Sequence, residues 1–112
     1  MQGKVPTEVW LAYCTWPARN LADQFAANLV ERGLAACAAV SGPISSHYLW
    51  QGQVEQSEEW LVTIKCCSSQ REALKAYTQE CHPYEVPELL MVEVGDGLPE
   101  YLQWVRDSAG NA

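Results

Sequence analysis

Two segments with the composition of β-strands are apolar at both odd and even positions, and this feature constrains the fold most. Residues 9–15 read VWLAYCT and residues 88–94 read ELLMVEV. A strand with one face in water alternates polar and apolar side chains, whereas a strand buried on both faces reads as a continuous apolar run. A sheet that contains both segments therefore needs cover on each face, from helices of this chain or from another molecule.

Helical periodicity predicts three helices. Residues 18–32 carry apolar side chains every four positions, which indicates an amphipathic helix. Residues 69–72 have the pattern of a capping box that opens a second helix, and Pro83 stops it. Pro99 lies at the start of a third amphipathic helix over residues 98–105.

A long β-hairpin is predicted between the first two helices. Residues 34–40 and 44–50 form its first strand, interrupted by a bend or bulge at 41–43, which read Ser-Gly-Pro. The dipeptide Gln51-Gly52 resembles a two-residue hairpin turn, and residues 54–67 return as the second strand. The hairpin is long for so small a domain.

The element order β-α-β-β-α-β-α predicts an α+β fold, a ferredoxin-like βαββαβ sandwich with an additional C-terminal helix. We expect one domain over residues 1–112, with an ordered core at about residues 7–107. The first two helices cover one face of the antiparallel sheet in this architecture and leave the other face open. Because the segments 9–15 and 88–94 are apolar on both faces, the open face is expected to be an interface in a homo-oligomer.

Charge and composition exclude several classes of function. The formal net charge of −7 argues against a nucleic-acid partner and against docking to an anionic membrane. No segment approaches the roughly 20 apolar residues of a membrane span. The five cysteines are odd in number and lack Cys-x-x-Cys spacing, which favours a reducing compartment, so we expect a cytoplasmic protein. No nucleophile–base motif or phosphate-binding loop is present, so we expect no enzymatic activity.

One rim of the predicted sheet gathers candidate metal ligands. The first strand and the second helix end on the same side, which brings Cys14 near Cys81 and His82. Thiolates and imidazoles suit copper or zinc, so these three residues predict a metal site. Adjacent helical residues point about 100° apart, so Cys81 and His82 can share an ion only if the helix unwinds there.

Each candidate ligand also has a purely structural interpretation. Cys14 fits a buried thiol of a strand, and Cys81 fits core packing at helical spacing. His82 fits a residue favoured at a helix C-terminus by the helix dipole. A further unusual residue is Lys65, a charge within an apolar strand, which we expect to pair with Glu58 or Glu59 or to lie in a cleft.

Six segments, in one collinear order across nearly the whole chain, carry a resemblance to a known family. They are Cys14-Thr15-x-Pro17, Leu34-Ala35-Ala36-Cys37, Tyr48-x-Trp50-x-Gly52, Ile64-Lys65, His82-Pro83-Tyr84-Glu85-Val86-Pro87-Glu88 and Leu98-Pro99-x-Tyr101-Leu102-x-Trp104. Together they resemble the CutA-like divalent-cation tolerance proteins. The segments HPYEVPE and LAAC are specific, because neither is a generic structural motif.

The resemblance implies a ferredoxin-like subunit in a tight homotrimer, located in the cytoplasm and linked to tolerance of copper and other divalent cations. It also implies a copper ion bound by the cysteine at the position of Cys14. In some members the positions of Cys81 and His82 are both histidines; here His82 matches and Cys81 departs, and a thiolate there favours Cu(I). Ala18-Arg19 stand where members often carry acidic residues.

Two other functions are compatible with the same sequence. One is a trimeric signalling protein, similar to the PII-like regulators, that binds a small molecule in clefts between subunits. The other is an assembly or scaffold protein, in which the five tryptophans and the long hairpin serve only interfaces. Stabilisation by a metabolite would favour the first alternative, and a partner list that depends on Trp50 would favour the second.

Overall fold

The computed structural model describes residues 5–108. Its elements are β1 (Val9–Trp16), α1 (Arg19–Glu31), β2 (Cys37–Trp50), β3 (Gln53–Cys67), the 3₁₀ turn η1 (Ser68–Gln70), α2 (Arg71–Cys81), β4 (Leu90–Glu93) and α3 (Pro99–Ser108). The predicted order of strands and helices is confirmed. The ends of the predicted domain, residues 1–4 and 109–112, lie outside the described residues.

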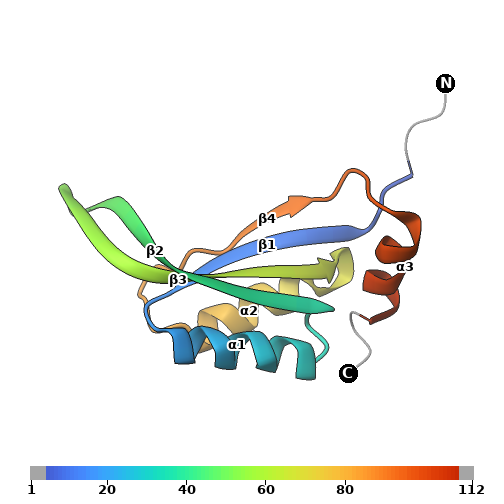
Figure 1. Cartoon of the computed structure of the whole chain (residues 1–112), viewed down its shortest axis with the longest axis horizontal. Helices are drawn as coiled ribbons and strands as arrows, with labels where there is room; N and C mark the ends of the chain where they lie inside the picture. Colours follow the sequence, from blue (N-terminus) through green and yellow to red (C-terminus); the bar gives the residue numbers. More distant parts are fainter. Residues whose placement is uncertain (1–4, 109–112) are drawn as a thin grey trace.

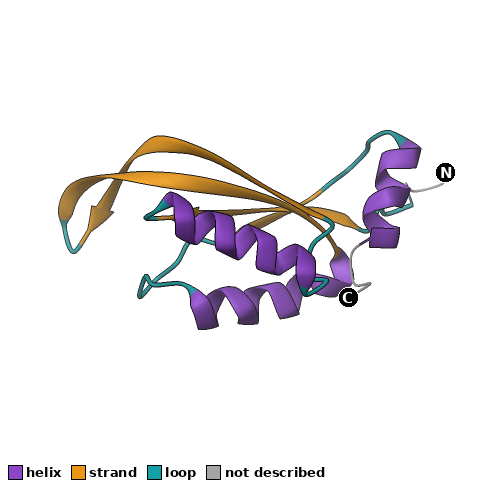
Figure 2. Ribbon diagram, turned by 60° about the horizontal axis from the view of Figure 1, so that its bottom comes forward, coloured by secondary structure: helices purple, strands orange, loops and turns teal. Residues whose placement is uncertain are grey.

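The four strands form one antiparallel sheet in the order β2-β3-β1-β4, with α1 and α2 together on one face (Figures 1 and 2). This is the predicted ferredoxin-like arrangement with one extra helix. The paired β2 and β3 run on past the helices as an extended arm, which Figure 1 shows on the left. The arm carries strand residues that neither helix covers.

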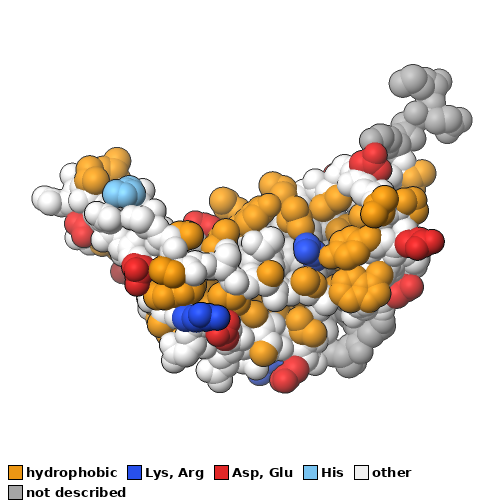
Figure 3. Space-filling view, viewed as in Figure 1, with side chains coloured by type: hydrophobic (Ala, Val, Ile, Leu, Met, Phe, Trp, Pro, Cys, Tyr) orange, Lys and Arg blue, Asp and Glu red, His pale blue; other side chains and the backbone are white. Residues whose placement is uncertain are grey.

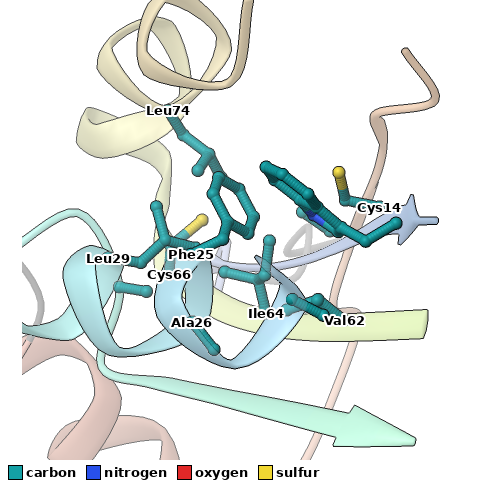
Figure 4. Packing of buried hydrophobic residues seen from close by; sticks show 12 residues of the cluster. Cys14, Phe25, Ala26, Leu29, Val62, Ile64, Cys66 and Leu74 are labelled. Atoms are coloured by element: carbon teal, nitrogen blue, oxygen red, sulfur yellow. The ribbon is translucent and has the colours of Figure 1, made fainter. Parts of the chain in front are cut away.

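The helix-covered face of the sheet holds the main core (Figure 4). Ala12, Cys14 and Trp16 of β1 point towards the helices, because alternate residues of a strand face opposite sides. They pack with Phe25 and Leu29 of α1, and the cluster extends to β3 and α2 through fully buried side chains: Val62, Ile64, Cys66 and Leu74. The apolar side of α1 therefore packs against the side of β1 that carries every second residue.

The other face of the sheet is covered only at one end, by α3. There Val9 is buried against Leu102 and Val105. Beyond α3 the face stays open, and Leu90 and Val92 of β4 are 62% and 48% exposed. Figure 3 shows hydrophobic side chains gathered between the hairpin arm and α3. This surface, called the open face below, matches the prediction that one apolar side of the sheet lacks cover from the chain itself.

The hairpin agrees with its sequence pattern except at its start. Residues 34–36 were expected in the strand, but β2 begins at Cys37 because Gly33, at φ 71°, turns the chain out of α1. The predicted bulge is confirmed as a shift in the β2–β3 register between Ser41 and Ile44. The two-residue turn is also confirmed, since Gln51 and Gly52 both have positive φ, at 51° and 78°.

Two other boundaries differ from the prediction. The capping box opens η1 and not α2, since Gln70 Oε1 accepts a hydrogen bond from the Cys67 backbone N–H at 3.2 Å. Gln70 is the N-cap residue of α2 without a side-chain cap bond there, so the box predicted to begin at Ser69 is wrong. Glu72 instead pairs with Lys75 at 2.7 Å. Strand β4 starts at Leu90 and not at residue 88, because its ladder with β1 spans only four residue pairs.

Candidate functional site

The end of β1, the end of α2 and the segment 82–88 converge at one rim of the sheet, as predicted. Helix α2 ends at Cys81, and His82 already has extended backbone, with ψ 136°. The helix therefore terminates between the two residues, which is the condition that their joint use as ligands required. Within the sheet Cys14 pairs with Val62, close to the end of β1.

His82 is held by hydrogen bonds at both ring nitrogens. Its Nδ1 accepts a hydrogen bond from the backbone N–H of Tyr84 at 3.1 Å. The ring is therefore protonated at Nε2, which donates to the carbonyl oxygen of Thr15 at 2.7 Å. The ring also lies against Trp16, with centroids 4.1 Å apart, and only 8% of the residue is exposed. Burial lowers the pKa of His82, so the imidazole is neutral at pH 7.

The Thr15 carbonyl explains why an imidazole is needed there. The β1–β4 ladder ends at the pair Tyr13–Leu90, so β4 supplies no partner to β1 beyond Tyr13. The His82 side chain takes over as a donor two residues further along and ties the segment after α2 to the strand. His82 is also the C-cap residue of α2, as considered from the sequence, since its backbone N–H donates to the Thr78 carbonyl at 2.9 Å. Its side chain thus has a structural role at this rim in addition.

Cys14 is fully buried in the core. Burial raises the pKa of its thiol to about 12, an effect that the Trp16 indole partly offsets and the Glu88 charge increases. The thiol is therefore protonated at neutral pH, whereas metals bind thiolate. The alternative interpretation of Cys14 as a buried strand cysteine is the one that this geometry favours.

Cys81 is exposed and its thiol is free, so the alternative that it packs in the core is wrong. Its charge contributes to the raised pKa of Cys14, which places the two residues at the same rim. In the single subunit the Cys14 thiol is buried and protonated, and the His82 imidazole has both nitrogens bonded. In this arrangement the two groups do not fit a copper ion. Across residues 5–108, no three His, Cys, Asp or Glu side chains are grouped as metal ligands. The copper site at Cys14, Cys81 and His82 stays a prediction.

A groove of about 740 Å³ opens beside this rim, between the hairpin arm and the segment 83–88. Tyr48 and Trp50 line it from the hairpin, and Tyr84 lines it from the opposite side. Glu59, a buried residue of β3 with 7% exposure, accepts a hydrogen bond at Oε2 from the Tyr84 hydroxyl at 2.8 Å. We call this space the acidic groove.

The acidic groove concentrates negative charge without a strong base. Burial raises the pKa of Glu88, and the nearby charge of Glu59 raises it further. Burial and the hydrogen bond to Glu59 likewise raise the pKa of Tyr84. No Lys or Arg is among the described residues that line the groove, and its one imidazole, His47, lies 3.3 Å from the Ser45 hydroxyl. A positively charged group would therefore be stabilised here.

The sequence places Cys14, Cys81 and His82 at this rim but does not indicate that Glu59 and Glu88 lie beside them. The signal for Glu59 was its position in β3, at the same parity as Lys65, which puts both side chains on the open face. The segment 83–88, which carries Glu88, folds back over the end of this face, and no periodic pattern in the sequence predicts this path of the chain.

Lys65 does not pair with Glu58 or Glu59 of its own chain, so the expectation of a pair within the chain is wrong. Lys65 lies six positions along β3 from Glu59, a distance of about 20 Å along an extended strand. The Lys65 ammonium lies instead 5.7 Å from the ring centroid of Tyr101 in α3. Lys65 makes no ion pair with any carboxylate in the part of the chain that the structure describes.

None of the helices within residues 5–108 is long and apolar enough to cross a membrane.

Comparisons with known proteins agree with this fold. The family model described as CutA1 divalent ion tolerance protein matches residues 10–108. A protein CutA homolog of Xenopus laevis is 45% identical over 96 residues, which cover 86% of this chain and 64% of that protein. The divalent-cation tolerance protein CutA of Thermus thermophilus is 36% identical over 96 residues, which cover 86% of this chain and 93% of that protein.

The chain thus spans about three-fifths of the length of the vertebrate relatives and nearly all of the bacterial one. Among solved structures, CutA1 of Shewanella sp. SIB1 superposes with a TM-score of 0.89 at 34% identity, covering 96% of this chain and 100% of that one. The Cut A1 protein of Thermus thermophilus gives a TM-score of 0.88 at 34% identity, covering 91% and 99%. The resemblance seen in the sequence is confirmed, and the chain belongs to the CutA1 divalent ion tolerance protein family.

Proposed function

We propose that this protein acts in divalent-cation tolerance as a homotrimer and works by binding, without catalysis. The open face is the observation that carries the proposal. Leu90 and Val92 of β4 are exposed there, and two aromatic residues of α3, Tyr101 and Trp104, are 42% and 46% exposed. Exposed apolar surface of this kind is unfavourable in water, and identical copies that pack sheet against sheet would cover it.

The absence of catalysis is supported by the chemistry of the rim. The thiol of Cys14 is buried and protonated, and the imidazole of His82 is neutral with both nitrogens bonded. Neither group is free to act as nucleophile or base. A cytoplasmic location is supported by the cysteines, since all five thiols are free.

Sedimentation velocity at low micromolar concentration tests the assembly. We expect one species with three times the mass of the chain, and we expect the variant Val92→Asp to dissociate because it places a charge on the open face. An exposed valine of α1, Val30, gives a matched control, and Val30→Asp should keep the wild-type mass. A stable, well-folded wild-type monomer at this concentration would refute the homotrimer.

Growth in elevated copper tests the role. A host that lacks its own divalent-cation tolerance protein should regain growth when it expresses this chain, and the Val92→Asp variant should restore less. Equal growth with the wild type, with Val92→Asp and with an empty vector would contradict a role in tolerance.

Copper is the cation that we propose for binding, with Cys14, Cys81 and His82 as ligands, on condition that metal binding displaces the proton of the Cys14 thiol and the hydrogen bond from His82 to Thr15. Support comes from the exposed thiol of Cys81 and from the convergence of two thiols and an imidazole at one rim. The trimer should be titrated with Cu(I) and with Cu(II). We expect Cys81→Ser and the double variant Cys14→Ser/His82→Ala to bind more weakly, and Cys37→Ser to bind as the wild type does. Equal affinity in all four proteins would show that this ligand set is wrong.

A further inference from the structure

The open face has opposite charges at its two ends. Near α3 it carries Lys65, whose neighbours across the strands are Leu11 of β1 and Cys37 of β2. At the far end the acidic groove contains Glu59 and Glu88. The two ends lie about 20 Å apart along β3, so they cannot neutralise each other within one subunit.

Each end lacks a partner within its own subunit. Lys65 has one aromatic ring nearby and no carboxylate at salt-bridge distance in residues 5–108. Glu59 is only 7% exposed, yet the one hydrogen-bond donor to its carboxylate within the described residues is a neutral phenol, the Tyr84 hydroxyl. A buried charge is costly unless an opposite charge accompanies it. Burial of the open face in an assembly would also remove water from Lys65.

The apolar surface between the two ends makes a second copy of the chain the best occupant of the groove. An interface that covers Leu90 and Val92 would extend from the α3 end of the open face to the groove. In a ring of identical subunits, one end of an interface meets the other end on the neighbour. Charge complementarity then brings the lysine of one copy to the carboxylates of the next.

We propose that Lys65 of one subunit enters the acidic groove of a neighbouring subunit and pairs with its Glu59 and Glu88 carboxylates. This inference rests on the proposed homotrimer and names the contact that fixes its register. Tyr48 and Trp50 of the hairpin arm then form an apolar wall around the stem of the entering lysine, since long basic side chains bury their methylenes while the ammonium stays solvated or paired.

Zero-length carbodiimide cross-linking of mixed trimers tests the contact directly. Subunits grown in ¹⁴N and ¹⁵N media are exchanged, cross-linked and digested. We expect a Lys65–Glu88 or Lys65–Glu59 linked peptide in which the two halves carry different isotopes. Lys75, which pairs with Glu72 on the exposed side of α2, should give only links within one subunit. A trimer that yields no mixed-isotope link from Lys65 would overturn the inference.

Charge reversal gives the second test. We expect Lys65→Glu and Glu88→Lys each to speed subunit exchange at least about tenfold, and the double variant to return within about threefold of the wild type. Lys75→Glu serves as the control and should leave exchange unchanged. Circular dichroism identifies any variant that fails to fold. In that case Lys65→Gln and Glu88→Gln replace the charge reversals, and each is again expected to speed subunit exchange.

The outcomes separate the two proposals. A wild-type monomer would refute the homotrimer and this contact together. A wild-type trimer in which the two reversals act independently, with no rescue in the double variant, would refute the contact alone. A small molecule that copurifies in the groove, with no Lys65 cross-link formed after its removal, would refute it as well.

Discussion

The two faces of the sheet use the same strands and residues of similar hydrophobicity, yet they differ in what completes them. On the helix-covered face, Cys14 and Ile64 are fully buried within the chain. On the open face, Leu90 and Val92 are left about half exposed or more by the same four strands. The hydrophobic contribution to stability is proportional to the apolar area removed from water. The covered face therefore stabilises the subunit, whereas the open face can contribute only when another molecule covers it. Hydrophobicity of a strand predicts that it will be covered, but not by which molecule.

The largest expected difference between the faces is in thiol reactivity. Because burial raises the pKa of Cys14 to about 12 from an ordinary value of 9.0, its thiolate fraction is roughly a thousandfold below that of an ordinary thiol. In iodoacetamide labelling followed by mass spectrometry, Cys81 should react first and Cys14 last. Cys37, half-buried on the open face, should react in a dilute monomeric variant such as Val92→Asp and be protected in the assembled protein. Equal labelling of Cys37 in both states would break the comparison.

A core truncation on the covered face should have the next largest effect. Leu29 is fully buried and packs in the main core, so Leu29→Ala should lower the free energy of unfolding by about 2–5 kcal/mol. Urea unfolding of the Val92→Asp background isolates the subunit from its assembly. The neighbouring Val30→Ala, at a half-exposed site on the same helix, should change stability by less than about 1 kcal/mol. Equal losses in the two variants would show that α1 does not supply the core as described.

Removal of the His82 side chain should cost less than a core truncation. The variant His82→Ala leaves the Thr15 carbonyl and the Tyr84 amide without their partner, which should lower the free energy of unfolding by about 1–3 kcal/mol. The variant His82→Gln retains a donor for Thr15 and should recover part of the loss. Stability is read from urea unfolding in the presence of a chelator. An unchanged midpoint for His82→Ala would contradict its structural role.

His82 also predicts a dependence on pH. Burial holds its pKa in the folded protein below the ordinary value of 6.5, so the unfolded chain binds the proton first as pH falls. The contribution of His82 is therefore full above about pH 7 and declines as pH drops through 6.5 towards the lower folded pKa. The difference in unfolding free energy between the wild type and His82→Gln should shrink over that window. A difference that stays constant from about pH 7.5 to about 5.5 would argue against a buried neutral imidazole.

The smallest effect on stability is expected at the tip of the hairpin arm, which lies outside both the helix-covered face and the open face. Gln51 has φ 51° and precedes Gly52, a geometry that favours Asn-Gly in a two-residue turn. Gln51→Asn should therefore raise the free energy of unfolding, by less than about 1 kcal/mol. Thermal unfolding measures the shift, and Gln53→Asn, just inside β3, is the control and should not stabilise. A loss of stability on Gln51→Asn would indicate a different turn.

Sequence reasoning reached further for the fold than for the site. Elements were predicted because periods of two and of about four residues are local properties, visible in residues 9–15 and 18–32 before any contact is known. The rim was predicted because topology alone brings the ends of β1 and α2 together. The chemical state of each group at the rim was not predicted, since the protonation of Cys14 and the hydrogen bonds of His82 depend on groups from other elements.

The sequence by itself determined that this chain forms a ferredoxin-like sheet with apolar side chains on both faces, because alternation and helical spacing are written into neighbouring residues. Only the tertiary structure decided that Lys65 and Glu59 lie at opposite ends of one open face without oppositely charged partners among the described residues. That arrangement depends on strand register and on the path of the segment 83–88 back over the sheet, and both are set by long-range packing that no local pattern encodes.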